Sequence, residues 1–169
     1  METLRQLVDL ARLSASARNL QALKYILVSD PLRNALVFPN LSWAGYLKDW
    51  PGPVEGERPS AYIIILGDKN ICQSFGCDHG IAAQSILLGA TEMKLGGCMI
   101  GSIAREKLRH ELQIPDRYKI LLVIALGKPK KKVKIEAVGP EENIKYWRSN
   151  DGIHHVPKRS LEEIILHSW

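Results

Sequence analysis

The chain has few cysteines and no long apolar run, and these two shortages exclude several classes of protein. Its three cysteines, Cys72, Cys77 and Cys98, form an odd and sparse set, which argues against a disulfide framework. No second pair of cysteines or histidines stands at zinc spacing from Cys72 and Cys77, so we expect no metal site. No apolar run reaches the ~18 residues that span a bilayer, and we expect neither a membrane segment nor a signal peptide.

The sequence also lacks the motifs that identify many enzymes. It has no G-x-S-x-G nucleophile elbow, no Walker phosphate loop, and no G-x-G-x-x-G after a strand. His154 and His155 are adjacent, so on a regular element they would point in different directions, and no third ligand accompanies them. Asp78 and His79 are adjacent in the sequence, but adjacency alone does not identify them as a catalytic dyad. We therefore predict no catalytic residue and no metal ligand.

What is present suits one soluble domain. The 169 residues are 46% apolar and 24% charged, which is the balance of a globular protein with a sizeable core. We expect a single domain over residues 1–169, located in the cytoplasm. Much of the net charge of +5 lies in Lys128 to Lys134. Such a run contacts nucleic acid in some proteins, but no RNA- or DNA-binding signature accompanies it, and we expect a solvated segment and no nucleic-acid partner.

Periodicity indicates a chain with few strands, of α+β or α/β class. It predicts helices over 3–13, 78–95 and 104–112, strands over 24–30, 61–68 and 118–129, and a short strand or turn over 96–102. Ser102 is placed to cap the helix that follows it, and Ser160 opens a capping box before a final short helix or turn. Residues 138–157 show no clear period, and we expect a loop there.

Two further segments have marked compositions. The helix from Asp78 is rich in glycine and alanine, so another backbone can approach it closely, either a second helix or a symmetry mate. Residues 31–60 read as a long loop with one short helix, and they carry Trp43, Tyr46 and Trp50. These aromatic residues suit the rim of a substrate site, and they suit equally well a hydrophobic lid over the core.

Three segments together suggest a cofactor site. SASARNLQALKY (14–25) offers hydroxyl and amide groups, GGCMIGSI (96–103) offers glycine-flanked backbone, and HHVPKRSLEEI (154–164) offers Lys158 and Arg159. Hydroxyls and amides suit a heterocycle with a ribityl chain, bare backbone can approach a flat ring, and a basic pair suits a phosphate. Taken singly, each segment is better explained as a polar turn, a tight turn or a surface pair, respectively.

In this order the three segments resemble the FMN-dependent nitroreductase family. That family carries a pattern like A-P-S-x-x-N-x-Q-P-W, which stands here as Ala15 to Leu23, with alanine in place of the proline and leucine in place of the tryptophan. Its central helix and glycine turn match residues 78–115, and the strand ending in ALGKP (125–129) is similar to the family's strand. The resemblance extends from about Thr3 to Leu166.

The resemblance implies a fold, an assembly and a site. The fold is the α+β nitroreductase sandwich, three layers with a central antiparallel-rich sheet flanked by helices, and the protein is a homodimer with the 78–95 helix in its core. FMN is held at the subunit interface. One subunit contributes Ser16, Ala17, Asn19 and Gln21, and the other contributes Met99, Ile100, Gly101 and Ser102, with a backbone N–H near flavin N5. Lys158 and Arg159 correspond to the family's basic pair near the phosphate.

The implied activity is transfer of a hydride from NADH or NADPH through the flavin to a nitroaromatic, a quinone or a similar acceptor. The family also has an arginine- and serine-rich phosphate segment before its first core helix, whereas this chain begins with Met1, Glu2 and Thr3 at the helix itself. We therefore expect weaker FMN binding than in the family. The alternative is a nitroreductase-fold homodimer that has weak or lost FMN binding and serves as an interaction module.

Overall fold

The two longest apolar runs of the sequence lie next to each other in the centre of a four-stranded sheet. In this computed structural model, which describes residues 1–139 and 141–169, the strand order is β1-β2-β4-β3 and every neighbouring pair is antiparallel. The bounds are β1 Leu23–Val28, β2 Ala61–Asp68, β3 Gly96–Ile100 and β4 Tyr118–Gly127. The sheet belongs to the first of two compact units, formed by residues 1–43 and 52–129.

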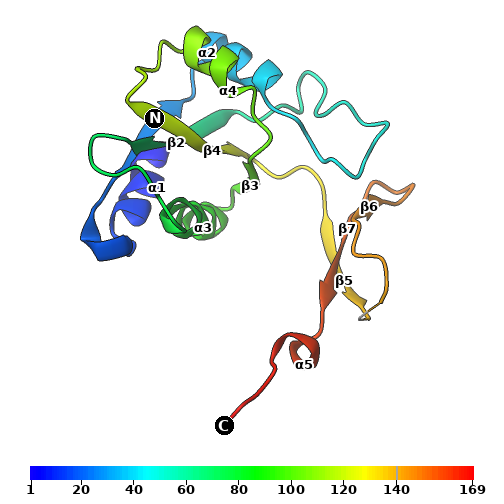
Figure 1. Ribbon diagram of the computed structural model, residues 1–169. Helices are drawn as coiled ribbons and strands as arrows, with labels where there is room; N and C mark the ends of the chain where they lie inside the picture. The colour runs from blue at the N-terminus through cyan, green and yellow to red at the C-terminus, as the bar shows by residue number, and fades with distance from the viewer. Residues whose placement is uncertain (140) are drawn as a thin grey trace. The chain divides into compact units, whose positions relative to one another are not determined.

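Helices cover both faces of this sheet, which explains why its central strands are apolar throughout. Along β2, Ile63 and Ile65 pack among α1 (Glu2–Arg12) and α3 (Asp78–Glu92) on one face. Tyr62 and Ile64 alternate with them and pack on the opposite face. The elements of that face are α2 (Pro31–Val37), the 3₁₀ turn Phe38–Asn40, and α4 (Arg105–Glu111) (Figure 1). The predicted three-layer α+β sandwich is confirmed.

The strand β4 contains a β-bulge at its middle. Ile65 and Leu66 are consecutive in β2, yet they pair with Leu122 and Ile120, so Leu121 has no counterpart in β2. The bulge shifts the alternation of side chains by one residue. As a result Ile120 faces the same core as Val123, although a regular strand would place these two on opposite faces.

The small residues of α3 admit a helix of the same chain. A side chain at Gly89 would overlap with Leu10 of α1, because a Cβ there would stand 2.2 Å from the Leu10 Cδ1 and 3.2 Å from the Leu7 Cδ2. Leu7 is fully buried at this contact. The prediction that this helix packs against a second helix is therefore confirmed, while its packing against a symmetry mate stays a prediction.

The second unit, residues 44–51 and 130–169, is a three-stranded sheet with a short helix. Its strands are β5 Val133–Val138, β6 Trp147–Arg148 and β7 His154–Arg159, with β7 in the middle and parallel to β5. The expected loop over 138–157 is right for residues 139, 141–146 and 149–153, but wrong for Val138, for β6 and for the start of β7; Pro140 lies outside the described residues. Pro157 argues against a strand in the sequence, because proline is rare in strands. In the structure the two-residue β6 pairs only with His154 and His155, so Pro157 lies beyond the part of β7 that pairs with β6.

The helix caps give one success and one error. Ser160 precedes α5 (Leu161–Ile164), and its side chain accepts a hydrogen bond from the Glu163 N–H, as the capping box predicts. Ser102 does not cap α4. The N-cap residue of that helix is Ala104, which makes no side-chain capping hydrogen bond. Within the described residues, no helix combines the length and apolarity that crossing a membrane requires.

Candidate functional site

The turn from Ser16 to Gln21, between α1 and β1, is held in an unusual backbone conformation. Arg18, Asn19 and Gln21 have φ values of 52°, 54° and 51°, in the left-handed region that side chains other than glycine adopt at a cost. Two hydrogen bonds stabilise the turn. The Gln21 N–H donates to the Ser16 Oγ at 3.2 Å, and the Ala17 N–H donates to the Asp78 Oδ1 at 3.0 Å. Strain of this kind is typical of ligand-binding loops.

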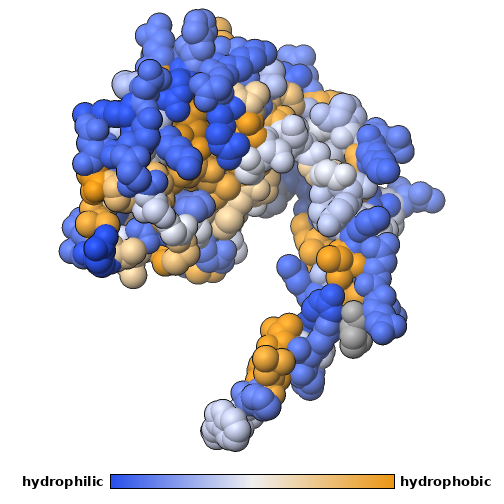
Figure 2. Space-filling view, viewed as in Figure 1, coloured by the Kyte–Doolittle hydropathy of each residue, from blue (hydrophilic) through white to orange (hydrophobic). Residues whose placement is uncertain are grey.

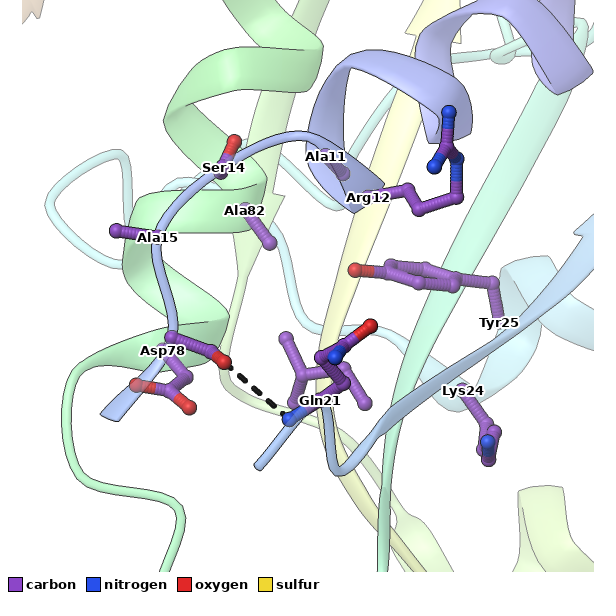
Figure 3. Close-up of a pocket in the computed structure, with 11 residues that line it drawn as sticks. Ala11, Arg12, Ser14, Ala15, Gln21, Lys24, Tyr25, Asp78 and Ala82 are labelled. Atoms are coloured by element: carbon purple, nitrogen blue, oxygen red, sulfur yellow. Dashed lines mark hydrogen bonds between the residues drawn. The ribbon is translucent and has the colours of Figure 1, made fainter. Parts of the chain in front are cut away.

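A cavity of about 200 Å³ lies beside this turn, between α1, β1 and the first turns of α3 (Figure 3). Its lining mixes hydroxyl, amide and charged groups with small apolar ones: Ala11, Arg12, Ser14, Ala15, Ser16, Gln21, Leu23, Lys24, Tyr25, Asp78 and Ala82. The Tyr25 hydroxyl points into it (Figure 3). Burial raises the pKa of the Tyr25 phenol, so the hydroxyl stays neutral and can donate a hydrogen bond.

The predicted residues of this segment divide into two groups. Ser16 and Gln21 line the cavity, whereas Ala17 and Asn19 are exposed on the outer side of the turn. No sequence pattern singles out Tyr25 or assigns Asp78 a role. Asp78 was visible as an acidic residue in the first helical turn, but its bond to a residue sixty-one positions away gives no local sequence signal. The bond occupies one oxygen of this buried carboxylate, which anchors the turn to α3.

The other predicted segment ends β3 and enters a tight connection to α4. Ile100 is buried there, while Met99, Gly101 and Ser102 are exposed. Gly101 has a φ outside the left-handed region, and a Cβ added to it would meet nothing within 4 Å. Neither its conformation nor crowding within the chain requires a glycine. Bare backbone at this place leaves room for something that is not part of the chain.

Backbone hydrogen bonds fix this connection to the loop that follows α2. The Ser42 N–H donates to the Ser102 carbonyl at 3.0 Å, and the Ala104 N–H donates to the Asn40 carbonyl at 2.9 Å. A bridge between Leu41 and Ile103 lies between these two bonds. The connection is therefore held on both sides of Ile103, although most of its side chains are exposed.

The two predicted segments lie at opposite edges of the four-stranded sheet. The Ser16–Gln21 turn leads into β1, and Met99 to Ser102 end β3, and these are the two edge strands. The structure of one chain therefore does not bring the two sets together.

The predicted phosphate pair belongs to the second unit. Lys158 and Arg159 end β7, and both are exposed. Arg159 is ion-paired with Glu163, four residues later in α5.

The aromatic residues of the long loop divide between the two units. Trp43 stacks on Phe38 with ring centroids 5.5 Å apart and packs against the core of the first unit, as a lid would. In the second unit, Tyr46 lies 4.9 Å from the ring of Tyr146, and the Arg148 guanidinium stands 3.9 Å above Trp50. Each of the three thus contacts another side chain of its own unit, and their role at the rim of a substrate site stays a prediction.

Polar residues of the second unit form one further cluster. The His155 Nδ1 lies 2.6 Å from the Glu136 Oε1, and its Nε2 lies 2.9 Å from the Ser149 Oγ. The His155 hydrogen bond, followed by that of Lys134, lowers the pKa of the Glu136 carboxyl. The Ser149 hydroxyl also donates to Asp151, and the Trp147 ring stacks on the imidazole. These bonds tie β5, β6 and β7 together.

Metal binding finds no support in residues 1–139 and 141–169, where no three histidine, cysteine or acidic side chains gather in a way that could hold an ion. In the same residues the three cysteines are free thiols.

Comparison with known proteins identifies the matching part of the chain. A family model described as the nitroreductase family matches residues 74–128, from just before α3 to the end of β4. A comparison with curated proteins finds no match. The predicted resemblance to the nitroreductase family is confirmed by this match together with the solved structures that follow.

Several solved structures share the fold. A nitroreductase family protein from Clostridium difficile 630 has 18% identity and a TM-score of 0.62, over 76% of this chain and 72% of that one. An FMN-dependent nitroreductase from Clostridium difficile R20291 has 25% identity and a TM-score of 0.59, over 76% of each chain. A protein from Parabacteroides distasonis ATCC 8503 is provisionally named an NADH dehydrogenase/NAD(P)H nitroreductase. It has 25% identity and a TM-score of 0.63, over 88% of this chain and 84% of that one.

Proposed function

We propose that this chain, with its nitroreductase fold and family segment, is an FMN-dependent oxidoreductase that uses NADH or NADPH. The observation that carries the proposal is the strained Ser16–Gln21 turn, held by Asp78 beside a cavity with hydroxyl and amide groups. Structurally similar proteins are named FMN-dependent nitroreductase and NAD(P)H nitroreductase, which supports the same chemistry here.

The residues present fit the chemistry of FMN. The ribityl chain and the heterocycle need hydrogen-bonding partners, and the Ser16 hydroxyl, the Gln21 amide and the Tyr25 phenol all line the cavity. A flat ring needs a wall without side chains, and the open backbone at Gly101 provides one. Ala17 and Asn19 complete the first set, and Met99, Ile100 and Ser102 complete the second.

The site requires two copies of the chain. Because the two sets stand at opposite edges of one sheet, a complete site takes Ser16 to Gln21 from one copy and Met99 to Ser102 from another. A homodimer gives two such sites. In this proposal both units of the chain form one functional domain, and Lys158 and Arg159 hold the phosphate as charged donors.

The protein's part in the reaction is placement. Bound FMN supplies the acceptance of a hydride from NADH or NADPH and its transfer to a nitroaromatic, a quinone or a similar acceptor. The chain's own residues bind and orient the partners of that transfer. The Tyr25 phenol keeps its proton because burial raises its pKa, so it serves as a fixed donor and not as a base.

The test is the visible spectrum of the purified chain with added FMN. We expect a bound flavin whose absorbance bleaches with NADH or NADPH in the absence of oxygen and returns with a quinone or a nitroaromatic. Gln21→Ala removes a cavity amide, and with about 0.5–1.5 kcal/mol for a hydrogen bond it should raise the Kd for FMN roughly three- to tenfold. Gln73→Ala, outside the cavity lining, is the matched control and should bind like the wild type.

One observation favours the second candidate, a homodimer of this fold that acts as an interaction module without tight FMN binding. Arg159, which the proposal assigns to the phosphate, is engaged by Glu163 in this structure. If the wild-type chain takes up no flavin from an excess of FMN, the oxidoreductase proposal fails and the interaction module becomes the leading function.

A further inference from the structure

Arg105, the first residue of α4, binds three backbone carbonyls at once. Its Nε donates to the Ile120 carbonyl at 3.0 Å, and its Nη2 donates to the Gly101 carbonyl at 3.1 Å and to the Leu121 carbonyl at 3.4 Å. One side chain therefore joins the end of β3 to the middle of β4. The resemblance to a family did not single out this residue.

The bulge in β4 makes this contact possible. Successive carbonyls of a regular strand point to opposite sides, so one guanidinium would not bind two in a row. The unpaired Leu121 breaks that alternation, and the carbonyls of Ile120 and Leu121 both reach Arg105. β3 ends at Ile100 opposite Val123, so Arg105 takes the place in the ladder where β3 would have continued.

The same side chain fixes the open backbone at Gly101. Ser42 and Asn40 hold the far end of the connection through the Ser102 carbonyl and the Ala104 N–H. Arg105 holds its near end through the Gly101 carbonyl, and the position of a Gly101 Cβ remains open. Arg105 thus restrains the Gly101–Ser102 peptide at its carbonyl, and Ser42 restrains the next peptide at the Ser102 carbonyl, while one surface of the backbone stays free for a ligand.

We infer that Arg105 is a positioning residue, which holds the Gly101 connection in the geometry that receives the flavin ring; the inference rests on the proposed function. Arg105 acts through the backbone and need not touch the ligand. The simpler explanation is that Arg105 only fastens α4 to the sheet. Arg109 provides the comparison, since it lies on the same helix and its Nη1 donates to the carbonyls of Ile114 and Pro115 at 3.2 and 3.0 Å, in the connection from α4 to β4.

The experiment compares R105M, R105K and R109M in the full chain. The first readout needs no flavin: amide hydrogen exchange over residues 100–104, where R105M should exchange roughly tenfold faster and R109M at the wild-type rate. The second is the Kd for FMN, which R105M should raise about tenfold and R109M less than about twofold. R105K keeps a charged donor without the planar fork, so both readouts should fall between the wild type and R105M.

The outcomes separate the inference from the proposed function. If the wild type binds FMN and R105M and R109M raise the Kd equally, Arg105 is a structural residue only and the inference is overturned. The inference is also overturned if exchange over residues 100–104 is unchanged in R105M. A wild-type chain that binds no FMN would contradict the proposed function itself, and the inference would fail with it.

Discussion

Tyr62 lies fully buried in the central strand β2, and burial raises the pKa of its phenol to about 12 from an ordinary value of 10.0. The folded state therefore opposes ionisation, while the unfolded state does not. The contribution of Tyr62 to stability is complete below pH 10.0 and is lost as the pH rises toward about 12.

Tyr62→Phe should remove this part of the alkaline sensitivity. Between about pH 8 and about pH 11, both proteins lose unfolding free energy. The wild type should lose roughly 1 kcal/mol more than the variant. Urea unfolding at the two pH values measures the difference. Tyr25 is present in both proteins and cancels. Equal losses in the wild type and the variant would show that folding does not raise the pKa of Tyr62.

Single residues show where sequence reasoning reached the site and where it did not. Ser16 and Gln21 were found because hydroxyl and amide side chains stand out between a helix and a strand, and both line the cavity. Asp78 and Arg105 act on the backbone of distant segments through hydrogen bonds. Local patterns carry no sign of such partners, since either residue is also an ordinary charged group at the start of a helix.

Two glycines of the first unit predict opposite effects of the same substitution. Gly67, the residue before the last in β2, lies against the ring of Phe75, and a Cβ there would stand 2.4 Å from the ring's Cζ. Gly80 lies in α3, where a Cβ would meet nothing within 4 Å. Phe75 is buried and has little freedom to move, so a methyl group at Gly67 has no room. A methyl group at Gly80 does have room.

Gly67→Ala should lower the unfolding free energy by about 1–3 kcal/mol, the usual cost of overpacking a core. Gly80→Ala is the matched control, and it should raise the unfolding free energy by up to about 1 kcal/mol because alanine favours a helix. Chemical denaturation of both variants gives the two signs. A Gly67→Ala protein as stable as the wild type would mean that the Phe75 ring can move aside.

Among the elements, long apolar runs were the most predictable. β2 was placed from Ala61 to Asp68 with the bounds that the structure has, because helices on both faces demand an unbroken apolar strand. The short strands of the second unit were missed. In β5 charged residues alternate with apolar ones, and in β7 two histidines precede a proline, so neither pattern resembles a buried strand.

At the scale of the whole molecule, the proposed homodimer draws on an exposed apolar face. Ile81 and Leu88 lie seven residues apart on α3, on one side of the helix, and Leu88 is 62% exposed. Figure 2 shows apolar surface on the first unit where Figure 1 places α3. A second copy packed on this face would bury these side chains.

Leu88→Glu should therefore convert the dimer to a monomer, since a buried carboxylate without a partner is costly. Sedimentation velocity measures the mass, and FMN binding should be lost with it because the site needs two copies. Leu32→Glu alters a leucine of α2 that is 80% exposed and should leave a dimer. A Leu88→Glu protein that remains a dimer would place the interface elsewhere.

The bulge in β4 has a consequence for the length of the chain. Insertions and deletions are usually tolerated in surface loops, where they disturb few contacts. Here the sensitive position is Leu121, in the interior of a central strand. Loss of that one residue would restore regular alternation with Ile120 still on the face of Val123, but it would remove the pair of adjacent carbonyls that Arg105 binds. Relatives that keep an equivalent of Arg105 should also keep the extra residue, so the two features should be gained or lost together.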